Sequence, residues 1–297
     1  MNAQVHVPVL TTEVVRYLQP ERGGLFVDCT VGLGGHAGAL LEAGASRVLG
    51  LDRDASALEG ARETLERWSD QVDLVHADYR TLPDVLDRRG VGLVDGALAD
   101  LGLSSLQLDS SGRGFSFRRD EPLDMRMDQT SGPSAADLLA RVTEQELADA
   151  IYQFGEERFS RRIARSIVAA RLEAPVATTG RLADLVRRSV PRRGYSRIDP
   201  ATRTFQALRI WVNQELEGLD RFLATTARRL RVGARLVVIT FHSLEDRIVK
   251  HTLRALENGA EALVRVLTKK PVVASEDEVQ QNPRSRSAKL RAAERVA

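Results

Sequence analysis

Cysteine is nearly absent from this chain: Cys29 is the only one among 297 residues. A single cysteine excludes an internal disulfide and a cysteine cage for a metal ion. No apolar stretch approaches the roughly 20 residues that a membrane-spanning helix needs. The first ten residues, MNAQVHVPVL, lack the basic start and apolar core of a secretory signal peptide. We therefore expect a cytoplasmic protein that is not held in a membrane.

The clearest motif is a strand, a glycine-rich turn and a helix start. The run Leu25-Phe26-Val27 predicts a buried strand ending in Asp28, and glycines follow at positions 32, 34 and 35. A helical pattern begins directly afterwards and reaches Gly44, its expected C-cap. Such a turn holds nucleotide-like ligands, because glycines let the backbone approach closely and a helix start offers free N–H groups. A tight turn without a ligand is the alternative.

An acidic residue at the end of the next strand favours the ligand-binding interpretation. That strand, 47–51, is followed by Asp52, 18 residues beyond Gly34, where an acid can bind the two hydroxyls of a ribose. The third glycine of a dinucleotide-binding turn is replaced by Ala37, and Asp28 would repel a pyrophosphate. A cationic adenosyl ligand such as S-adenosylmethionine therefore fits better than NAD.

The order of the predicted elements indicates an α/β fold with an insertion. Further strands at 72–76 and 94–98 alternate with helical patterns at 55–68 and 82–89, which predicts a parallel sheet with ligands at its carboxyl edge. The segment 104–129 is loop-like, and only helical patterns follow: 135–141, 144–152, 157–172, 181–190 and 204–216. Strands resume at 235–241, and 263–267 and 290–296 are expected to add an antiparallel edge. We thus expect one domain at 1–108 and 213–297, with a helical domain inserted at 109–212.

Positive charge is concentrated in two segments although the net charge is only +2. The segment 180–209 holds two acids and eight arginines, at positions 181, 187, 188, 192, 193, 197, 203 and 209. The segment from 282 to the end holds one acid, Glu294, and five basic residues: Arg284, Arg286, Lys289, Arg291 and Arg295. Either run alone could be a solvated face. Two of them beside an adenosyl site favour an anionic polymer as partner.

Several long motifs together identify a family resemblance over nearly the whole chain. They are HVPVL near the start, DCTVGLGGH at 28–36, LDRD at 51–54, ADLGLSSLQLD at 99–109, RGFSFRRDEPLDMRMD at 113–128, GEERFSRRIARSI at 155–167, ATRTFQALRIWVN at 201–213, FHSLEDRIVK at 241–250 and NPRSRSAKLR at 282–291. The chain resembles the bacterial methyltransferases that modify the exocyclic amine of a cytosine in small-subunit (16S) ribosomal RNA.

This resemblance implies a Rossmann-like methyltransferase sheet with an inserted all-helical substrate-recognition domain. It also implies methyl transfer from S-adenosyl-L-methionine to 16S rRNA, within the small ribosomal subunit. The family holds its cofactor at positions that are here Gly34, Gly35, His36, Asp52, Tyr79, Asp100 and Gln107. Phenylalanine would be as readily expected at Tyr79, and either ring could pack on the adenine.

The residue types bear on which atom of the base accepts the methyl group. Methylation of a pyrimidine ring carbon commonly uses a cysteine thiolate, whereas Cys29 lies beside the cofactor turn and is expected to pack as a core residue. An exocyclic amine instead needs an acceptor for its proton. Asp100, after the fourth strand, can accept that proton, bind the amino group of the cofactor, or do both. His242, after the strand 235–241, is a second catalytic candidate, although a structural hydrogen bond is the commoner role of such a histidine.

Other interpretations stay open at this stage. The remaining histidines show no metal-ligand spacing, and the zinc deaminase pattern is absent, so we expect no metal site. A dehydrogenase on the same sheet is opposed by Ala37 and Asp28. A non-catalytic, RNA-binding ribosome assembly factor with a bound adenosyl ligand is compatible with every motif. The sequence also leaves open the exact nucleotide, the form of the RNA substrate, and whether the protein is a monomer or a homodimer.

Overall fold

The chain divides into two compact units. The computed structural model describes residues 8–104, 107–108, 111–191 and 199–297. The first unit combines Met1–Ser104 with Glu217–Ala297, and the second is Ser105–Leu216. We call them the sheet unit and the helical unit. The boundaries predicted from sequence lie four residues from these at each junction.

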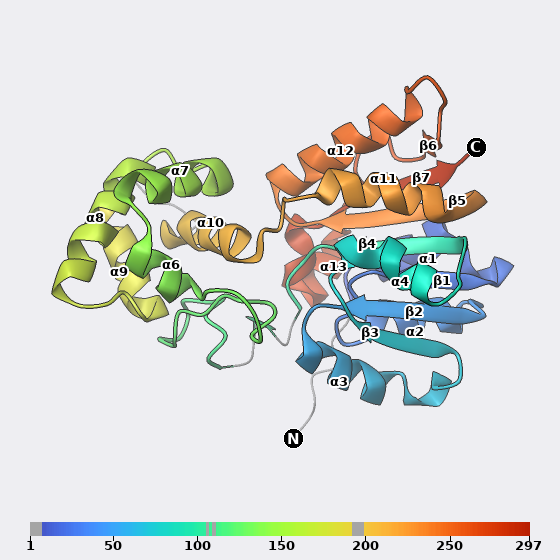
Figure 1. Ribbon diagram of the computed structural model, residues 1–297, viewed down its shortest axis with the longest axis horizontal. Coiled ribbons are helices and arrows are strands. Elements are labelled where there is room, and N and C mark those ends of the chain that lie inside the picture. Colours follow the sequence, from blue (N-terminus) through green and yellow to red (C-terminus); the bar gives the residue numbers. More distant parts are fainter. Residues whose placement is uncertain (1–7, 105–106, 109–110, 192–198) are drawn as a thin grey trace. The chain divides into compact units, whose positions relative to one another are not determined.

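A seven-stranded sheet forms the centre of the sheet unit (Figure 1). Its strands are β1 (Leu25–Asp28), β2 (Arg47–Asp52), β3 (Val72–His76), β4 (Val94–Asp100), β5 (Leu230–Thr240), β6 (Val264–Val266) and β7 (Lys289–Arg295). Their order is β3-β2-β1-β4-β5-β7-β6. The first five run parallel, whereas β7 is antiparallel to both β5 and β6. This is the dinucleotide-fold order with one antiparallel strand added between β5 and β6. The predicted Rossmann-like α/β fold and its antiparallel edge are confirmed.

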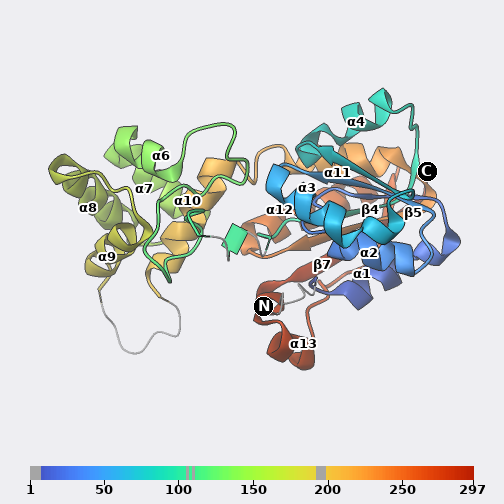
Figure 2. The same cartoon turned by 90° about the horizontal axis from the view of Figure 1, so that it is seen from below.

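Helices cover both faces of this sheet. One face carries α1 (Thr11–Leu18), α2 (Gly35–Glu42) and α3 (Ala55–Thr64), and the other carries α4 (Leu82–Arg88), α11 (Leu219–Arg229) and α12 (Ser243–Glu257). Figure 2 shows α4 and α11 on one side of the strands and α1 and α2 on the other. A hydrophobic core lies between the sheet and the helices on each face. Along β5 the side chains alternate between these cores: Leu236 and Val238 pack in the core with α4, α11 and α12, and Val237 and Ile239 pack in the core with α1, α2 and α3. Because both faces are buried, the strands are continuous apolar runs, which is why the sequence revealed them.

Local differences from the sequence predictions have identifiable causes. The N-cap of α1 is Leu10, in the left-handed conformation with φ 54°, and no side chain caps this helix start. The hydroxyl of Thr11 instead donates to the carbonyl of Pro8 (2.9 Å). Strand β5 begins at Leu230, five residues earlier than predicted. Gly233 lies inside this strand with φ 83°, close to a register shift against β4.

Short helical segments complete the sheet unit. The helical pattern predicted at 55–68 is divided into α3 and a 3-10 turn, η2 (Glu66–Trp68). Further 3-10 turns are η1 (Pro20–Arg22), η3 (Tyr79–Thr81) and η4 (Pro283–Ser287), and α13 (Glu276–Gln281) precedes η4. Turn η3 lies directly after β3 and carries Tyr79, one of the residues predicted to bind the cofactor.

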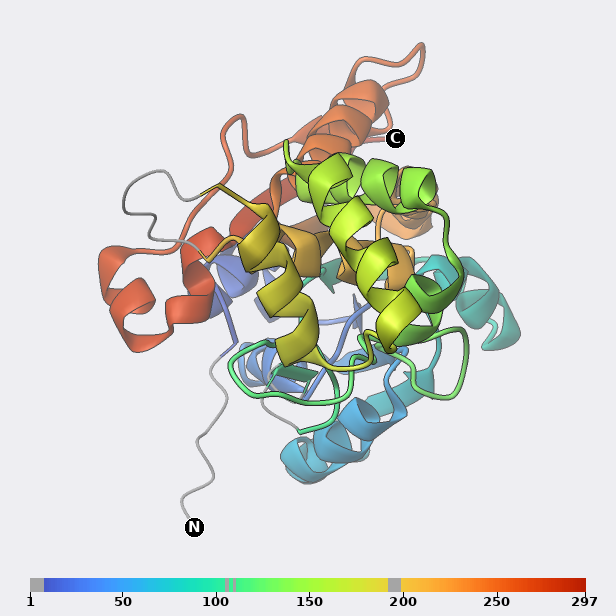
Figure 3. The same ribbon diagram turned by 90° about the vertical axis from the view of Figure 1, so that its left-hand side faces the viewer.

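The helical unit contains α6 (Ala135–Arg141), α7 (Glu144–Gly155), α8 (Ser160–Glu173), α9 (Thr179–Ser189) and α10 (Ala201–Asn213), shown in green and yellow in Figure 3. Capping boxes begin two of them. Ser134 with Asp137 starts α6, and Thr143 with Glu146 starts α7. No helix in the described part of the chain is both long and apolar enough to cross a bilayer.

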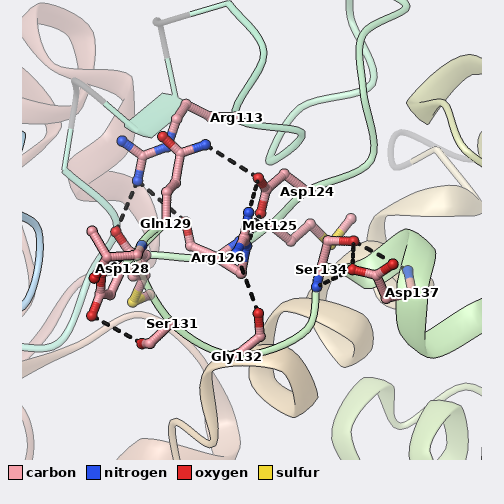
Figure 4. A network of polar contacts seen from close by, with 12 residues as sticks. Arg113, Asp124, Met125, Arg126, Asp128, Gln129, Ser131, Gly132, Ser134 and Asp137 are labelled. Carbon is pink, nitrogen blue, oxygen red and sulfur yellow. Dashed lines mark hydrogen bonds and ion pairs between the residues drawn. The ribbon is translucent and has the colours of Figure 1, made fainter.

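A loop that the sequence left irregular has a defined internal structure (Figure 4). The carboxylate of Asp124 accepts from Nε and Nη2 of Arg126 (2.7 and 2.9 Å). Arg113 donates to the carbonyl of Met127 (2.9 Å), and Asn213 of α10 bonds the backbones of Met127 and Met125 (2.8 and 2.7 Å). These contacts explain why the RGFSFRRDEPLDMRMD motif keeps charged residues in a segment without regular secondary structure.

Candidate cofactor and acceptor site

Three carboxylates lie at the ends of three neighbouring strands. Asp28 ends β1, Asp52 ends β2 and Asp100 ends β4, and β1 lies between the other two strands. The strand order reverses at β1 and β4, and ligands of open α/β sheets bind at the carboxyl edge of such a point. The sequence thus correctly placed Asp52 and Asp100 at one edge of the sheet.

The glycine turn from β1 to α2 is attached to the end of β2. The N–H of Gly32 donates to Asp52 Oδ2 (2.8 Å), and Val31 N–H donates to the carbonyl of Leu51 (2.8 Å). Gly34 is the N-cap of α2 with φ 86°, and a Cβ there would lie 2.9 Å from a methyl carbon of Leu65. Only glycine therefore fits that position, and Gly35 and His36 follow as the first residues of the helix.

Asp52 is partly buried and well supplied with hydrogen bonds. Besides Gly32, the N–H of Asp54 donates to its Oδ1 (2.9 Å). Burial raises the pKa of Asp52 to about 6, and these two backbone bonds work against that rise. Each carboxylate oxygen accepts more than one hydrogen bond, so both retain capacity for the hydroxyls of a ribose.

Asp28 and His36 carry buried polar atoms without hydrogen-bond partners. Asp28 is 1% exposed, and its Oδ1 accepts from Thr30 N–H (3.2 Å), whereas its Oδ2 bonds nothing within the described residues. Burial raises the pKa of this carboxyl to about 7. Among the residues that the structure describes, neither ring nitrogen of His36 has a hydrogen-bond partner, although Nε2 lies 3.4 Å from Asp100 Oδ2. Buried polar atoms are rarely left unsatisfied, so this set indicates a missing ligand.

Asp100 is more accessible than the buried Asp28. Its own N–H donates to Thr30 Oγ1 (2.7 Å), and Gly102 N–H donates to its Oδ1 (3.2 Å). Its side chain is 21% exposed, and its Oδ2 lies 3.4 Å from His36 Nε2. The tight turn after Asp100 needs Gly102, because a Cβ there would lie 2.5 Å from the ring of Phe241.

Tyr79 is held firmly next to the carboxyl end of β3. Its ring packs edge-on against Phe222 of α11, with ring centroids 4.6 Å apart. The flanking residues Asp78 and Arg80 form a two-pronged ion pair (2.8 and 2.7 Å), and Arg80 also reaches the carbonyl of Glu217 (3.2 Å). The predicted packing of this ring on adenine stays a prediction.

His242 is engaged in a helix cap. As N-cap of α12, it accepts through Nδ1 from Glu245 N–H (3.4 Å), and its Nε2 lies 3.1 Å from Glu245 Oε1. The other oxygen of Glu245 accepts from Phe241 N–H (3.0 Å). This arrangement gives the ring a structural task, and its catalytic role stays a prediction. Cofactor binding by Gln107, a buried residue of the helical unit, also stays a prediction.

The charges of this site suit a cationic ligand. Within the described residues, neither Asp28 nor Asp100 forms an ion pair with a lysine or arginine. A pyrophosphate would therefore meet uncompensated carboxylates, whereas a sulfonium and an ammonium group would be stabilised by them. The sequence treated Asp28 only as an argument against NAD and missed it as a site residue. An acid at the end of an apolar strand was the available signal.

The fold and this site define a methyltransferase that uses S-adenosylmethionine. The chain belongs to the MraW methylase family, whose profile matches residues 3–296. It is 52% identical over 309 residues to the ribosomal RNA small subunit methyltransferase H of Bradyrhizobium diazoefficiens, covering 100% of this chain and 93% of that protein. It is 48% identical over 307 residues to the protein of the same name from Geotalea uraniireducens, covering 98% of each.

One solved structure illustrates how far the chain can diverge from similar folds. The chain aligns with a putative methyltransferase from Streptococcus mutans in complex with SAH, with 12% identity and a TM-score of 0.44, covering 98% of this chain and 100% of that one. This likeness is too distant to transfer residues or activity.

Several arginines of the basic segment 180–209 are engaged in contacts within the helical unit. Arg181 donates to the carbonyls of Ala170 and Ala174, at the end of α8 (3.1 and 3.2 Å). Arg187 binds Asp199 and Arg209 binds Glu215 through paired contacts. Three further arginines, Arg192, Arg193 and Arg197, lie outside the described residues. A count of arginines therefore overstates the charge that is free for a partner.

Some of that charge does face solvent around a hollow in the helical unit. A cavity of about 610 Å³ is lined by Arg162, Arg187 and Arg188 together with Asp184, Val190 and Pro191. Arg162 and Arg188 are exposed, and neither has an acidic partner among the residues that the structure describes. Of these two, Arg188 belongs to the predicted basic segment 180–209, and Arg162 of α8 adds a cation from outside it.

Proposed function

We propose that this protein transfers the methyl group of S-adenosylmethionine to the exocyclic amine of a cytosine in small-subunit (16S) ribosomal RNA. The relatives named ribosomal RNA small subunit methyltransferase H support the substrate, since they share about half of their residues over the full chain. The observation that carries the choice of atom is the partly exposed Asp100 carboxylate, whose Oδ1 accepts from Gly102 N–H and whose Oδ2 lies 3.4 Å from His36 Nε2.

Asp100 is suited to the chemistry of an amine. The lone pair of an exocyclic amine is delocalised into the ring, so the amine is a poor nucleophile. A carboxylate that accepts its N–H localises that pair and takes the proton as the new C–N bond forms. S-adenosylmethionine supplies an electrophilic methyl group, whose bond to sulfur breaks in the same step. Gly102 and Thr30 fix the orientation of Asp100 from both sides.

Cys29 argues against the competing chemistry at a ring carbon. That chemistry requires a thiolate to add to the base. Cys29 is 1% exposed, and burial raises the pKa of its thiol well above the ordinary value. A buried, protonated thiol cannot serve as the nucleophile, so the amine remains the acceptor.

The helical unit is the proposed platform for substrate recognition. Its exposed Arg162 and Arg188 border a cavity, and an anionic RNA strand is the partner that such a surface attracts. His242 follows β5, the strand that neighbours the strand of Asp100. We propose that its main role is to cap α12 and that it also helps to position the base. An enzyme of ribosomal RNA works where subunits are assembled, so we propose a cytoplasmic location.

The test is methyl transfer from labelled cofactor to 16S rRNA, presented both free and in small subunits from cells that lack this enzyme. Nuclease digestion and mass spectrometry of the product should show one cytidine methylated on its amine. The variant Cys29→Ala should retain this activity, because the thiol has no part in it. A methyl group on the ring carbon would overturn the proposal. RNA binding without any single-turnover transfer would support the non-catalytic assembly factor instead.

A further inference from the structure

A basic groove lies in the sheet unit between α12, β6 and β7. Its volume is about 260 Å³, and the residues of α12 that line it follow the spacing of a single helix face. The polar lining residues are Lys250, Arg254 and Glu257 of α12, Thr268 and Lys269 after β6, and Arg291 of β7. We call this the α12–β7 groove.

The positive charge of this groove is only partly neutralised. Arg291 is held by Asp246 (2.6 and 3.3 Å), and Glu257 accepts from the N–H of Val266 (2.8 Å). The cations Lys250, Arg254 and Lys269 have no acidic partner within the residues that the structure describes. These three cations outnumber the one lining carboxylate, Glu257, so the hollow is positive on balance and suits an anion.

One neutral group in the groove can also donate to an anion. Thr268 is 4% exposed, and its Oγ1 accepts from Ala292 N–H (3.0 Å). With that lone pair occupied, the hydroxyl proton remains to be donated into the groove. The lining contains no aromatic side chain on which a base could stack. The groove therefore fits a phosphate group better than a nucleobase.

The register of the strands places one end of the groove, at Arg291, near the edge of the sheet that carries the proposed acceptor. Asp100 of β4 lies opposite Ile239 of β5, and Lys289 and Arg291 of β7 lie opposite Thr240 and Val238. From β4 across β5 and β7 to β6 is three strand spacings of about 4.8 Å each. A strand of RNA whose base reaches Asp100 can thus extend its backbone over β5 and β7.

We propose that the α12–β7 groove binds phosphodiester groups of the RNA strand next to the methylated base. This inference rests on the proposed function, because it assigns the same RNA a second contact surface on the sheet unit. In this arrangement Lys250, Arg254 and Lys269 position the substrate, while Asp100 contacts the reacting amine.

The lysines provide a direct chemical probe of this groove. The whole chain contains only four, Lys250, Lys269, Lys270 and Lys289, and two of them line it. Acetylation of lysine amines should therefore be slowed at Lys250 and Lys269 when 16S rRNA is bound. Lack of protection at both residues would overturn the assignment. The same measurement can be made with the small subunit bound. Protection that persists after the RNA of that subunit is digested by nuclease would show that a ribosomal protein covers the groove, and would also overturn the assignment.

A pair of matched variants tests the energetic contribution. Lys250→Ala with Lys269→Ala should flatten the dependence of RNA affinity on salt, by roughly 0.7 log units for each phosphate group that is no longer bound. The control, Arg47→Ala with Arg62→Ala, removes the same charge from exposed positions on β2 and α3 and should leave the salt slope unchanged. Cofactor affinity, measured by calorimetry, should be equal in all three proteins.

The outcomes also separate this inference from the proposed function. If the wild-type protein methylates 16S rRNA and the lysine variant keeps the wild-type salt slope, the groove assignment is wrong and the activity stands. If the wild-type protein transfers no methyl group to 16S rRNA, the proposed function fails before the groove is tested.

Discussion

At the scale of single residues, Asp100 is the side chain at which binding and catalysis can be separated. Asp100→Asn retains the shape and an oxygen for Gly102 N–H but loses the charge. We expect single-turnover methyl transfer to fall on the order of a hundredfold, while cofactor affinity falls little. Asp70→Asn, at an exposed position, is the control. If saturating cofactor restores the rate, Asp100 only anchors the cofactor and the catalytic assignment is wrong.

Asp52 is predicted to act on the cofactor alone. Asp52→Ala leaves ribose hydroxyls without an acceptor and should weaken cofactor binding by about 1–3 kcal/mol. The backbone N–H groups of Gly32 and Asp54 also lose their acceptor, so the variant Asp52→Asn, which keeps one, serves as the milder companion. Calorimetry on folded protein measures the effect. Unchanged affinity in a folded Asp52→Ala protein would remove Asp52 from the ribose site.

At the scale of elements, the β1–α2 turn makes a matched pair of glycine variants possible. Gly32 and Gly34 both have positive φ, 53° and 86°, but a Cβ at Gly32 meets nothing closer than 3.9 Å. Gly32→Ala should thus cost only the roughly 1–2 kcal/mol of a left-handed residue. Gly34→Ala adds the close approach to Leu65 at 2.9 Å and should lose more stability and most of its cofactor affinity. Equal losses in urea unfolding and calorimetry would show that the space beside Leu65 has no effect.

The same elements show what the sequence could predict. Strands β1, β2 and β4 are apolar runs that end in an acid, so both their existence and the convergence of Asp52 and Asp100 followed from pattern and topology. The sequence could not foresee that Glu245 engages His242, because helical spacing alone does not specify which atoms bond. Nor could it reveal that Asp199 and Glu215 neutralise Arg187 and Arg209. Each of these outcomes depends on side-chain geometry that charge counts do not contain.

At the scale of the whole molecule, the acids that attract the cofactor lower the stability of the empty protein. Burial raises the pKa of Asp28 to about 7 and of Asp52 to about 6, so these two carboxyls bind more protons in the folded than in the unfolded chain between about pH 4 and 7. Stability without cofactor should therefore fall as the pH rises through that window, by at most about 1.4 kcal/mol per pH unit for each carboxyl, and level off above it. Urea unfolding at a series of pH values measures this slope.

Cofactor binding should have the opposite dependence on pH. A cationic ligand favours the ionised carboxylates, so its affinity should rise between about pH 5.5 and 7.5, and binding near pH 6.5 should release protons to the buffer. Calorimetry in buffers of different ionisation enthalpy measures that release.

Asp28→Asn keeps the acceptor for Thr30 N–H but cannot ionise. It should make the empty protein more stable than wild type at pH 8, weaken cofactor binding and reduce the proton release. A wild-type affinity that stays constant across this pH range would show that Asp28 does not face the bound cation.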